Sequence, residues 1–341
     1  MNKLFFLIII LAANFKSISQ GRTYDFEISL PETKIPNSLY NKINFLDSRE
    51  DTSQMGIVQL GAFNKKATVV LKTPFSQQLT TVLNALIDST SKDGELLLQL
   101  RQLSFAEVTG AMSEKGYCYV RAVLYAREND GYKRAGAVDT VILVKAMDVT
   151  KALFRNGSKI INTLIADNLL KAPTDTKAIP MEDVKAINSI EKTAIKVYTD
   201  TGWKDGIYIN WYSFKNQQPD KPVFAEIKNG ELNSVKAPGE DNKIEKVKSK
   251  NLYAVVYNGK PFIATRYGYY PLERKDNDLF FTGKAEVSAN AGDVIAASFF
   301  FGIIGGLLAS DAEAMFDMKI DYSNGGFIRL REIKTTAAST E

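Results

Sequence analysis

The chain of 341 residues contains no histidine and a single cysteine, Cys118. Without histidine, a Ser-His-Asp or Cys-His nucleophilic site, a histidine-ligated metal and a histidine proton shuttle are all excluded. One cysteine cannot form an internal disulfide, a thiolate zinc cluster or an iron–sulfur centre. The composition still allows sites built from paired carboxylates, Ser-Lys dyads or oxygen-ligated calcium. We predict no catalytic residue, no cofactor and no metal site.

The first 19 residues have the three parts of a secretory signal peptide. Lys3 provides the basic start, residues 4–13 form an unbroken apolar stretch, and Ser17 and Ser19 place small side chains before Gln20. The apolar stretch is shorter than the roughly 20 residues that span a bilayer, which argues against the alternative of a retained anchor. We therefore predict cleavage of residues 1–19 and export, with the mature protein periplasmic or outer-membrane associated.

The remaining chain has a nearly balanced charge. Hydrophobic residues make up 45% of the full sequence and charged residues 24%, which is typical of a folded globular protein. After cleavage, 41 basic residues stand against 39 acidic ones, a net charge of about +2. This charge gives no electrostatic reason to bind nucleic acid, so we predict no nucleic-acid partner. The most lysine-rich run, residues 243–250, is typical of a solvated loop or strand edge.

Two halves of the chain follow different patterns. Residues 20–172 alternate strands with long amphipathic helices, whereas residues 204–334 contain short strands separated by turn signals. A helical connector covers residues 173–203, and residues 335–341 form a disordered tail. We predict an α+β fold, in which an antiparallel or mixed sheet with helices on one face precedes a β-meander domain. The meander forms a sandwich or a partial barrel.

In the first half, four strand patterns precede an amphipathic helix that follows Pro74, and three longer strand runs precede a second helix that Pro173 stops. In the middle run, Cys118 lies on an apolar row, whereas Tyr119 and Arg121 lie on the other face. A buried, unreactive thiol is therefore predicted. The third run, residues 138–144, is apolar on both faces, which predicts a strand in the interior of the sheet.

The connector is predicted to hold one helix. Pro180 suits its first turn, an apolar stripe runs from Val184 to Val197, and Gly202 suits the end. The helix bridges the two halves.

Asparagine–glycine pairs mark the turns of the second half. Asn229-Gly230 and Asn258-Gly259 are typical of type I′ hairpin turns, and Asn324-Gly325-Gly326 predicts a third turn. Aromatic residues crowd the same region, including Tyr253, Tyr267 and Tyr269. Packing within the sheets is the simpler interpretation, and an aromatic-lined groove for sugar or peptide is the alternative.

Residues 294–309 form a run of sixteen residues without a charge. Small side chains recur at every fourth position, and in a helix they would form one flat ridge that another backbone could approach. These ridge residues are Ser298, Gly302, Gly306 and Ser310. Three interpretations stay open: a buried element, a contact with a membrane or an envelope protein or a second copy, and a transmembrane span. A span would separate residues 315–331 from the rest of the meander.

Other motifs have simpler explanations. Asp47, Arg49, Glu50 and Asp51 are typical of a solvated loop with local salt bridges. Residues 89–92 match Ser-x-x-Lys but have the composition of a turn, and no companion motif occurs. Residues 240–242 lack the spacing of a calcium loop.

The second half resembles exported proteins of unknown function that are common in Bacteroidota. The resemblance rests on Gly206-Ile-Tyr-Ile-Asn-Trp-Tyr-Ser-Phe-Lys-Asn and on Tyr257-Asn-Gly-Lys-Pro-Phe-Ile. It implies a strand–helix opening before a β-meander. The first half is faintly similar to small envelope lipoproteins through Asp47-x-Arg49, although the lipid-bearing cysteine is absent. Neither resemblance implies a catalytic residue.

These observations favour a non-enzymatic cell-envelope protein that acts by binding or assembly, with residues 294–309 as the contact. The alternative is a carboxylate-based glycan hydrolase in the periplasm, with the aromatic meander as its platform.

Overall fold

The computed structural model describes residues 22–333, apart from residues 50–51, 62–64, 110–113, 130, 147, 174, 240 and 285–314. The predicted signal peptide, the C-terminal tail and the apolar run 294–309 lie outside the described residues. The ridge residues Ser298, Gly302, Gly306 and Ser310 lie outside them as well. Among the described residues, no helix has both the length and the apolar character needed to span a bilayer.

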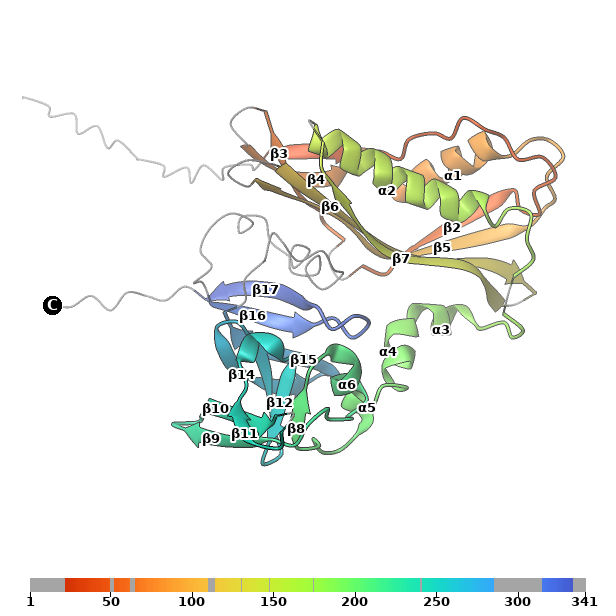
Figure 1. The fold of residues 1–341 in the computed structure, drawn as a ribbon. Helices are drawn as coiled ribbons and strands as arrows, with labels where there is room; N and C mark the ends of the chain where they lie inside the picture. The colour runs from red at the N-terminus through yellow and green to blue at the C-terminus, as the bar shows by residue number, and fades with distance from the viewer. Residues whose placement is uncertain are drawn as a thin grey trace, which may run out of the picture.

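The fold is α+β, as predicted. The first half forms a mixed sheet in the order β1-β4-β3-β5-β6-β7, and β2 also pairs with β5. Helices α1 (Phe75–Leu86) and α2 (Val149–Ala166) cover one face of this sheet, as Figure 1 shows. The strands are β1 (Thr23–Phe26), β2 (Lys42–Asp47), β3 (Gly56–Leu60), β4 (Lys65–Leu71), β5 (Glu95–Thr109), β6 (Glu114–Glu128) and β7 (Gly131–Val144).

The helices lie where their apolar stripes meet the apolar row of β6. Asp148 caps α2 by accepting a hydrogen bond from the Lys151 amide. At Gly157 a Cβ atom would lie 3.0 Å from the Phe105 ring and 3.2 Å from the Cys118 Sγ, so glycine lets α2 approach the sheet closely. Cys118 is fully buried there, and burial raises the pKa of its thiol far above the ordinary value. The prediction of a buried thiol is confirmed.

Strand β7 lies at an edge of the sheet, so the prediction that residues 138–144 form an interior strand is wrong. Val138 and Ile142 pack against the core under α2. On the other face, Leu143 remains 43% exposed. Apolar residues on both faces therefore do not require a partner strand on both sides.

The connector contains three short helices, α3 (Met181–Lys185), α4 (Ile187–Lys192) and α5 (Lys196–Thr199), instead of the one helix predicted. The break has a packing reason. Val184 packs against the first sheet, whereas Val197 and Tyr198 belong to the core of the second half. A single straight helix cannot place one apolar stripe against both surfaces, so the chain turns twice.

The second half is an open sheet in the order β17-β16-β15-β14-β13-β12-β8, with a smaller sheet in the order β11-β10-β9. Helix α6 (Trp211–Lys215) and α5 share one core with the large sheet, and the small sheet shares a second core with its other face. The strands are β8 (Gly206–Tyr208), β9 (Phe224–Lys228), β10 (Glu231–Pro238), β11 (Ile244–Lys246), β12 (Ala254–Tyr257), β13 (Lys260–Thr265), β14 (Gly268–Lys275), β15 (Asp278–Gly283), β16 (Met315–Ile320) and β17 (Phe327–Ile333).

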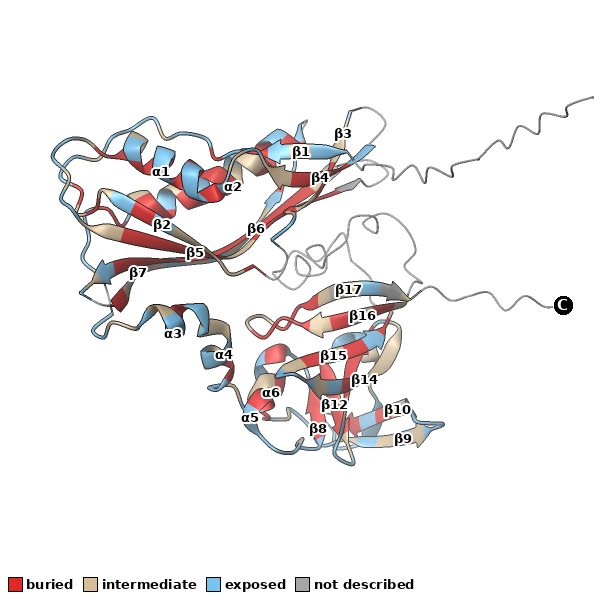
Figure 2. Cartoon of the chain, turned by 180° about the vertical axis from the view of Figure 1, so that it is seen from behind, coloured by how far each residue is buried: buried red, intermediate tan, exposed pale blue. Residues whose placement is uncertain are grey.

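All three predicted turns join antiparallel strands: β9 to β10, β12 to β13 and β16 to β17. Asn258 and Gly259 have φ values of 51° and 68°, the left-handed pair that a type I′ turn requires. The β16–β17 hairpin projects toward the face of the first sheet that α1 and α2 leave uncovered (Figures 1 and 2).

Gly325 in that hairpin is predicted to be irreplaceable. Its φ is +78°, and an added Cβ would lie 2.3 Å from Cγ of Trp211. Gly325→Ala should therefore lower the free energy of unfolding by about 2–5 kcal/mol, measured by urea denaturation. Gly259→Ala is the matched control because Gly259 also has a positive φ but faces open space, so its cost should be about 1–2 kcal/mol. Equal losses in the two variants would contradict the proposed clash.

Candidate functional site

Charged side chains of the described residues gather in two places. One is the contact between the two halves of the chain, and the other is a groove in the second half.

The contact between the halves is built around two arginines of the first sheet. Arg121 on β6 donates to Asp139 of β7 at 3.0 Å and to Asp321 of the β16–β17 hairpin at 3.3 Å. The side chains of Arg121 and Asp321 are each only 10% exposed. Beside them, the Tyr119 hydroxyl accepts a hydrogen bond from the Asn324 amide at 3.2 Å. The polar face of β6 is thus covered by a hairpin about 200 residues further along the chain.

Arg101 on β5 forms the second pair. Its guanidinium binds both carboxylate oxygens of Glu191 on α4, at 3.0 and 2.6 Å. The Tyr322 hydroxyl donates to the same carboxylate at 2.5 Å. Burial alone would raise the pKa of Glu191, but the hydrogen bonds from Arg101 and Tyr322 outweigh it and hold that pKa below its ordinary value.

Lys192 completes the contact. It binds Asp278 at 2.6 Å and lies 5.3 Å from the centre of the Tyr322 ring. Glu191, Asp278 and Asp321 therefore each meet a cation, and the charges balance across the contact. This balance is typical of a structural interface, because a buried charge is tolerated when a partner with good geometry neutralises it.

Removing a buried arginine from this contact should lower the stability of the protein. Arg121→Ala leaves Asp139 and Asp321 without their cation, and we expect a loss of about 3–5 kcal/mol in the free energy of unfolding. Arg127→Ala on the same strand is the control, because Arg127 is 51% exposed in its pair with Glu95, and its loss should stay below about 1 kcal/mol. Urea denaturation of both variants measures the difference. Similar losses would show that Arg121 does not hold the halves together.

The lowered pKa of Glu191 predicts that acid weakens the contact between the halves. Because its folded-state pKa lies below the unfolded value of 4.5, its contribution is complete above that value and is lost as the pH falls through the folded pKa. We expect the stability difference between the parent protein and Glu191→Gln to shrink between about pH 5 and about pH 3. Glu226→Gln, at an exposed carboxylate of β9, is the control. A difference that is constant across this range would contradict the prediction.

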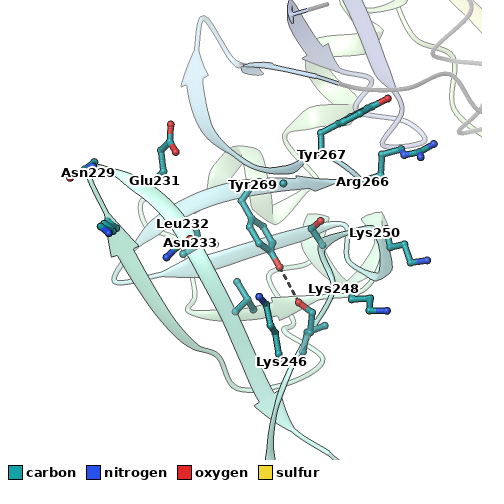
Figure 3. A pocket seen from close by; sticks show the side chains of 15 residues that line it. Asn229, Glu231, Leu232, Asn233, Lys246, Lys248, Lys250, Arg266, Tyr267 and Tyr269 are labelled. Atoms are coloured by element: carbon teal, nitrogen blue, oxygen red, sulfur yellow. Dashed lines mark hydrogen bonds between the residues drawn. The ribbon is translucent and has the colours of Figure 1, made fainter. Parts of the chain in front are cut away.

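The second place is a groove of about 690 Å³ between the small sheet and the β13–β14 turn. Figure 3 shows Lys246 and Tyr269 near its centre, with Lys248, Lys250 and Arg266 along one side. Fifteen residues line it: Lys228, Asn229, Glu231, Leu232, Asn233, Val235, Lys246, Val247, Lys248, Ser249, Lys250, Arg266, Tyr267, Gly268 and Tyr269.

Local structure places the cations of this groove. The short strand β11 ends at Lys246, and the chain then runs through Lys248 into a single helical turn, Ser249–Asn251. Lys246 and Lys248 are two positions apart in extended backbone, which puts both on one side of the chain. Arg266 comes from the β13–β14 turn and lies over the Tyr267 ring at 5.5 Å.

The floor of the groove is fixed. The Tyr269 hydroxyl donates to the Val247 carbonyl at 3.4 Å, and burial raises the pKa of Tyr269 to about 12, so the hydroxyl stays protonated. Leu232 and Val235 are buried in the core between the two sheets. These two side chains therefore add little accessible surface, and the accessible lining of the groove mixes polar groups with the rings of Tyr267 and Tyr269.

The charge of the groove is strongly positive. Four lysines and one arginine line it, against the single carboxylate of Glu231. Lys246, Lys248 and Lys250 are exposed and form no ion pair with a described carboxylate. Clustered cations on one wall raise the local concentration of anions even when the net charge of the protein is small.

The predicted motifs outside this groove have structural roles where they are described. Arg49 binds both oxygens of Asp47, at 2.9 and 2.7 Å, as a local salt bridge, whereas Glu50 and Asp51 lie outside the described residues. Asp88 accepts hydrogen bonds from the Thr90 amide and hydroxyl, which makes residues 88–92 a turn. Within the described part of the chain, no three metal-ligating side chains come together.

Sequence reasoning missed the groove because its members are spread over about 40 positions. The lysine run 243–250 does include a strand edge, as predicted, but its contact with Arg266 and Tyr267 depends on how the two sheets pack. The aromatic residues of the second half fall into two groups. Tyr253 and Phe281 are core residues, whereas Tyr267 and Tyr269 line the groove.

Comparison with protein-family models and with curated proteins gives no match. Among solved structures, the chain is similar to the crystal structure of protein XCC0632 from Xanthomonas campestris, of the family DUF330. The sequence identity is 11% and the TM-score 0.30, over 43% of this chain and 95% of that one.

Proposed function

We propose that this is a non-enzymatic binding protein of the cell envelope that holds an anionic ligand in the groove beside β11. The groove itself carries the proposal, because five cations and a single carboxylate line it. The predicted signal peptide supports a site of action outside the cytoplasm.

Binding fits this groove better than catalysis. A glycan hydrolase needs two carboxylates that face each other across the scissile bond. Of the residues that line the groove, Glu231 alone carries a carboxylate. The alternative of a carboxylate-based hydrolase therefore gains no support from the groove.

The second part of the proposal is that the apolar run 294–309 attaches the protein to the envelope. A contact of this run with an envelope protein or with the membrane would hold the exported protein at the envelope, while the groove binds the ligand. The resemblance to exported Bacteroidota proteins agrees with this proposal.

Dextran sulfate is a suitable first probe for the groove, because it is polyanionic and carries no specific sequence. We expect the triple variant Lys246→Ala, Lys248→Ala and Lys250→Ala to bind it at least about tenfold more weakly, and we expect binding by the parent protein to fall as salt rises. Isothermal titration calorimetry at two salt concentrations measures both effects.

A second triple variant controls for net charge. Lys159→Ala, Lys171→Ala and Lys177→Ala removes three exposed lysines outside the second half of the chain, two from the first half and one from the connector. Its affinity should stay within about twofold of the parent protein. Equal weakening in both triple variants would show that net charge, and not the groove, binds the probe.

A further inference from the structure

We infer that the ligand of the groove is an acidic polysaccharide, which rests on the proposed function and names its substrate class. The groove combines cations, tyrosine rings and asparagine amides in one open hollow (Figure 3). Three features of this combination separate an acidic sugar chain from other anions.

The first feature is the closed floor. An anionic lipid would need space for its acyl chain beside the cations. Leu232 is 5% exposed and Val235 is fully buried, and both belong to the core between the sheets. An acyl chain could enter the space between the sheets only by displacing that core, which favours a ligand without an acyl chain.

The second feature is the spread of the charges. Lys246 and Lys248 are about 7 Å apart along extended backbone, and Lys250 continues the series at the adjoining helical turn. Lys228 is the last residue of β9, and Arg266 lies in the β13–β14 turn. Cations distributed along an open groove match a ligand that repeats its negative charge along a chain, whereas a small anion would need donors that converge on one point.

The third feature is the chemistry of the side chains. Four of the five cations are lysines, which bind anionic groups as point charges and not with the bidentate geometry that arginine offers to carboxylate and phosphate. Tyr267 and Tyr269 offer rings whose apolar faces suit the C–H face of a sugar, and each carries a polar edge. Asn229 and Asn233 add amides that donate to and accept from sugar hydroxyls.

The experiment compares polygalacturonate, which is an acidic polysaccharide, with poly-glutamate and long-chain polyphosphate, by calorimetry on the full mature chain. Polygalacturonate should bind more tightly than the other two. Tyr267→Ala should lower the affinity for polygalacturonate by about three- to tenfold. The affinity for poly-glutamate should stay within about twofold of the parent value, because only a sugar ring contacts the aromatic face.

Tyr212→Ala is a matched control. Tyr212 is a tyrosine outside the groove, 67% exposed, and Lys215 lies over its ring at 5.6 Å, much as Arg266 lies over Tyr267. This variant should not change the affinity for any of the three polymers. Circular dichroism of both tyrosine variants confirms that the fold is intact.

The outcomes separate the inference from the proposed function. If poly-glutamate or polyphosphate binds as tightly as polygalacturonate, or if Tyr267→Ala behaves like Tyr212→Ala, the polysaccharide inference is overturned, while dependence on the groove lysines would still support an anion site. If none of the polymers binds, both the inference and the proposed function are overturned.

Discussion

The buried charge on the first sheet is the constraint on which the rest of the structure depends. Arg101 and Arg121 project from the face opposite α1 and α2, where water is largely excluded. Removing an ion from water costs several kcal/mol, so each guanidinium needs a carboxylate in good geometry. Glu191 supplies one from α4 of the connector, and Asp321 supplies the other from the β16–β17 hairpin of the second half. The position of α4 and the projection of the β16–β17 hairpin toward the first sheet both meet this requirement.

The same contact determines which parts of the second half remain free. The hairpin and α4 face the first sheet, whereas the small sheet β9–β11 lies at the far side of the second half (Figure 1). The groove that this small sheet forms with the β13–β14 turn is lined by other residues than those that make the contact between the halves. The cations of the contact are ion-paired, whereas Lys246, Lys248 and Lys250 of the groove form no ion pair with a described carboxylate. One chain thus uses lysine and arginine for two different purposes.

Local signals predicted the parts of the fold that are determined locally. The asparagine–glycine turns formed hairpins because only residues that tolerate a positive φ fit there, and the two long helices followed their apolar stripes. Features that depend on distant partners were not predictable. The apolar pattern of β7 does not distinguish an edge from an interior position, and the stripe of the connector does not reveal that Val184 and Val197 belong to different cores. The groove had one visible sign, the lysine run, but Arg266 and Tyr267 reach it only through the packing of two sheets.

The sequence distance across the contact has a consequence for how the protein folds. Arg121 and Asp321 are 200 residues apart, and Tyr119 and Asn324 are 205 apart. During synthesis the first sheet emerges with its arginines long before the hairpin that covers them exists. Closing so long a loop is entropically expensive, so the second half must form its own core before docking repays that entropy. The two halves therefore cannot dock before the β16–β17 hairpin has been synthesised, and until then this face of the first sheet stays uncovered.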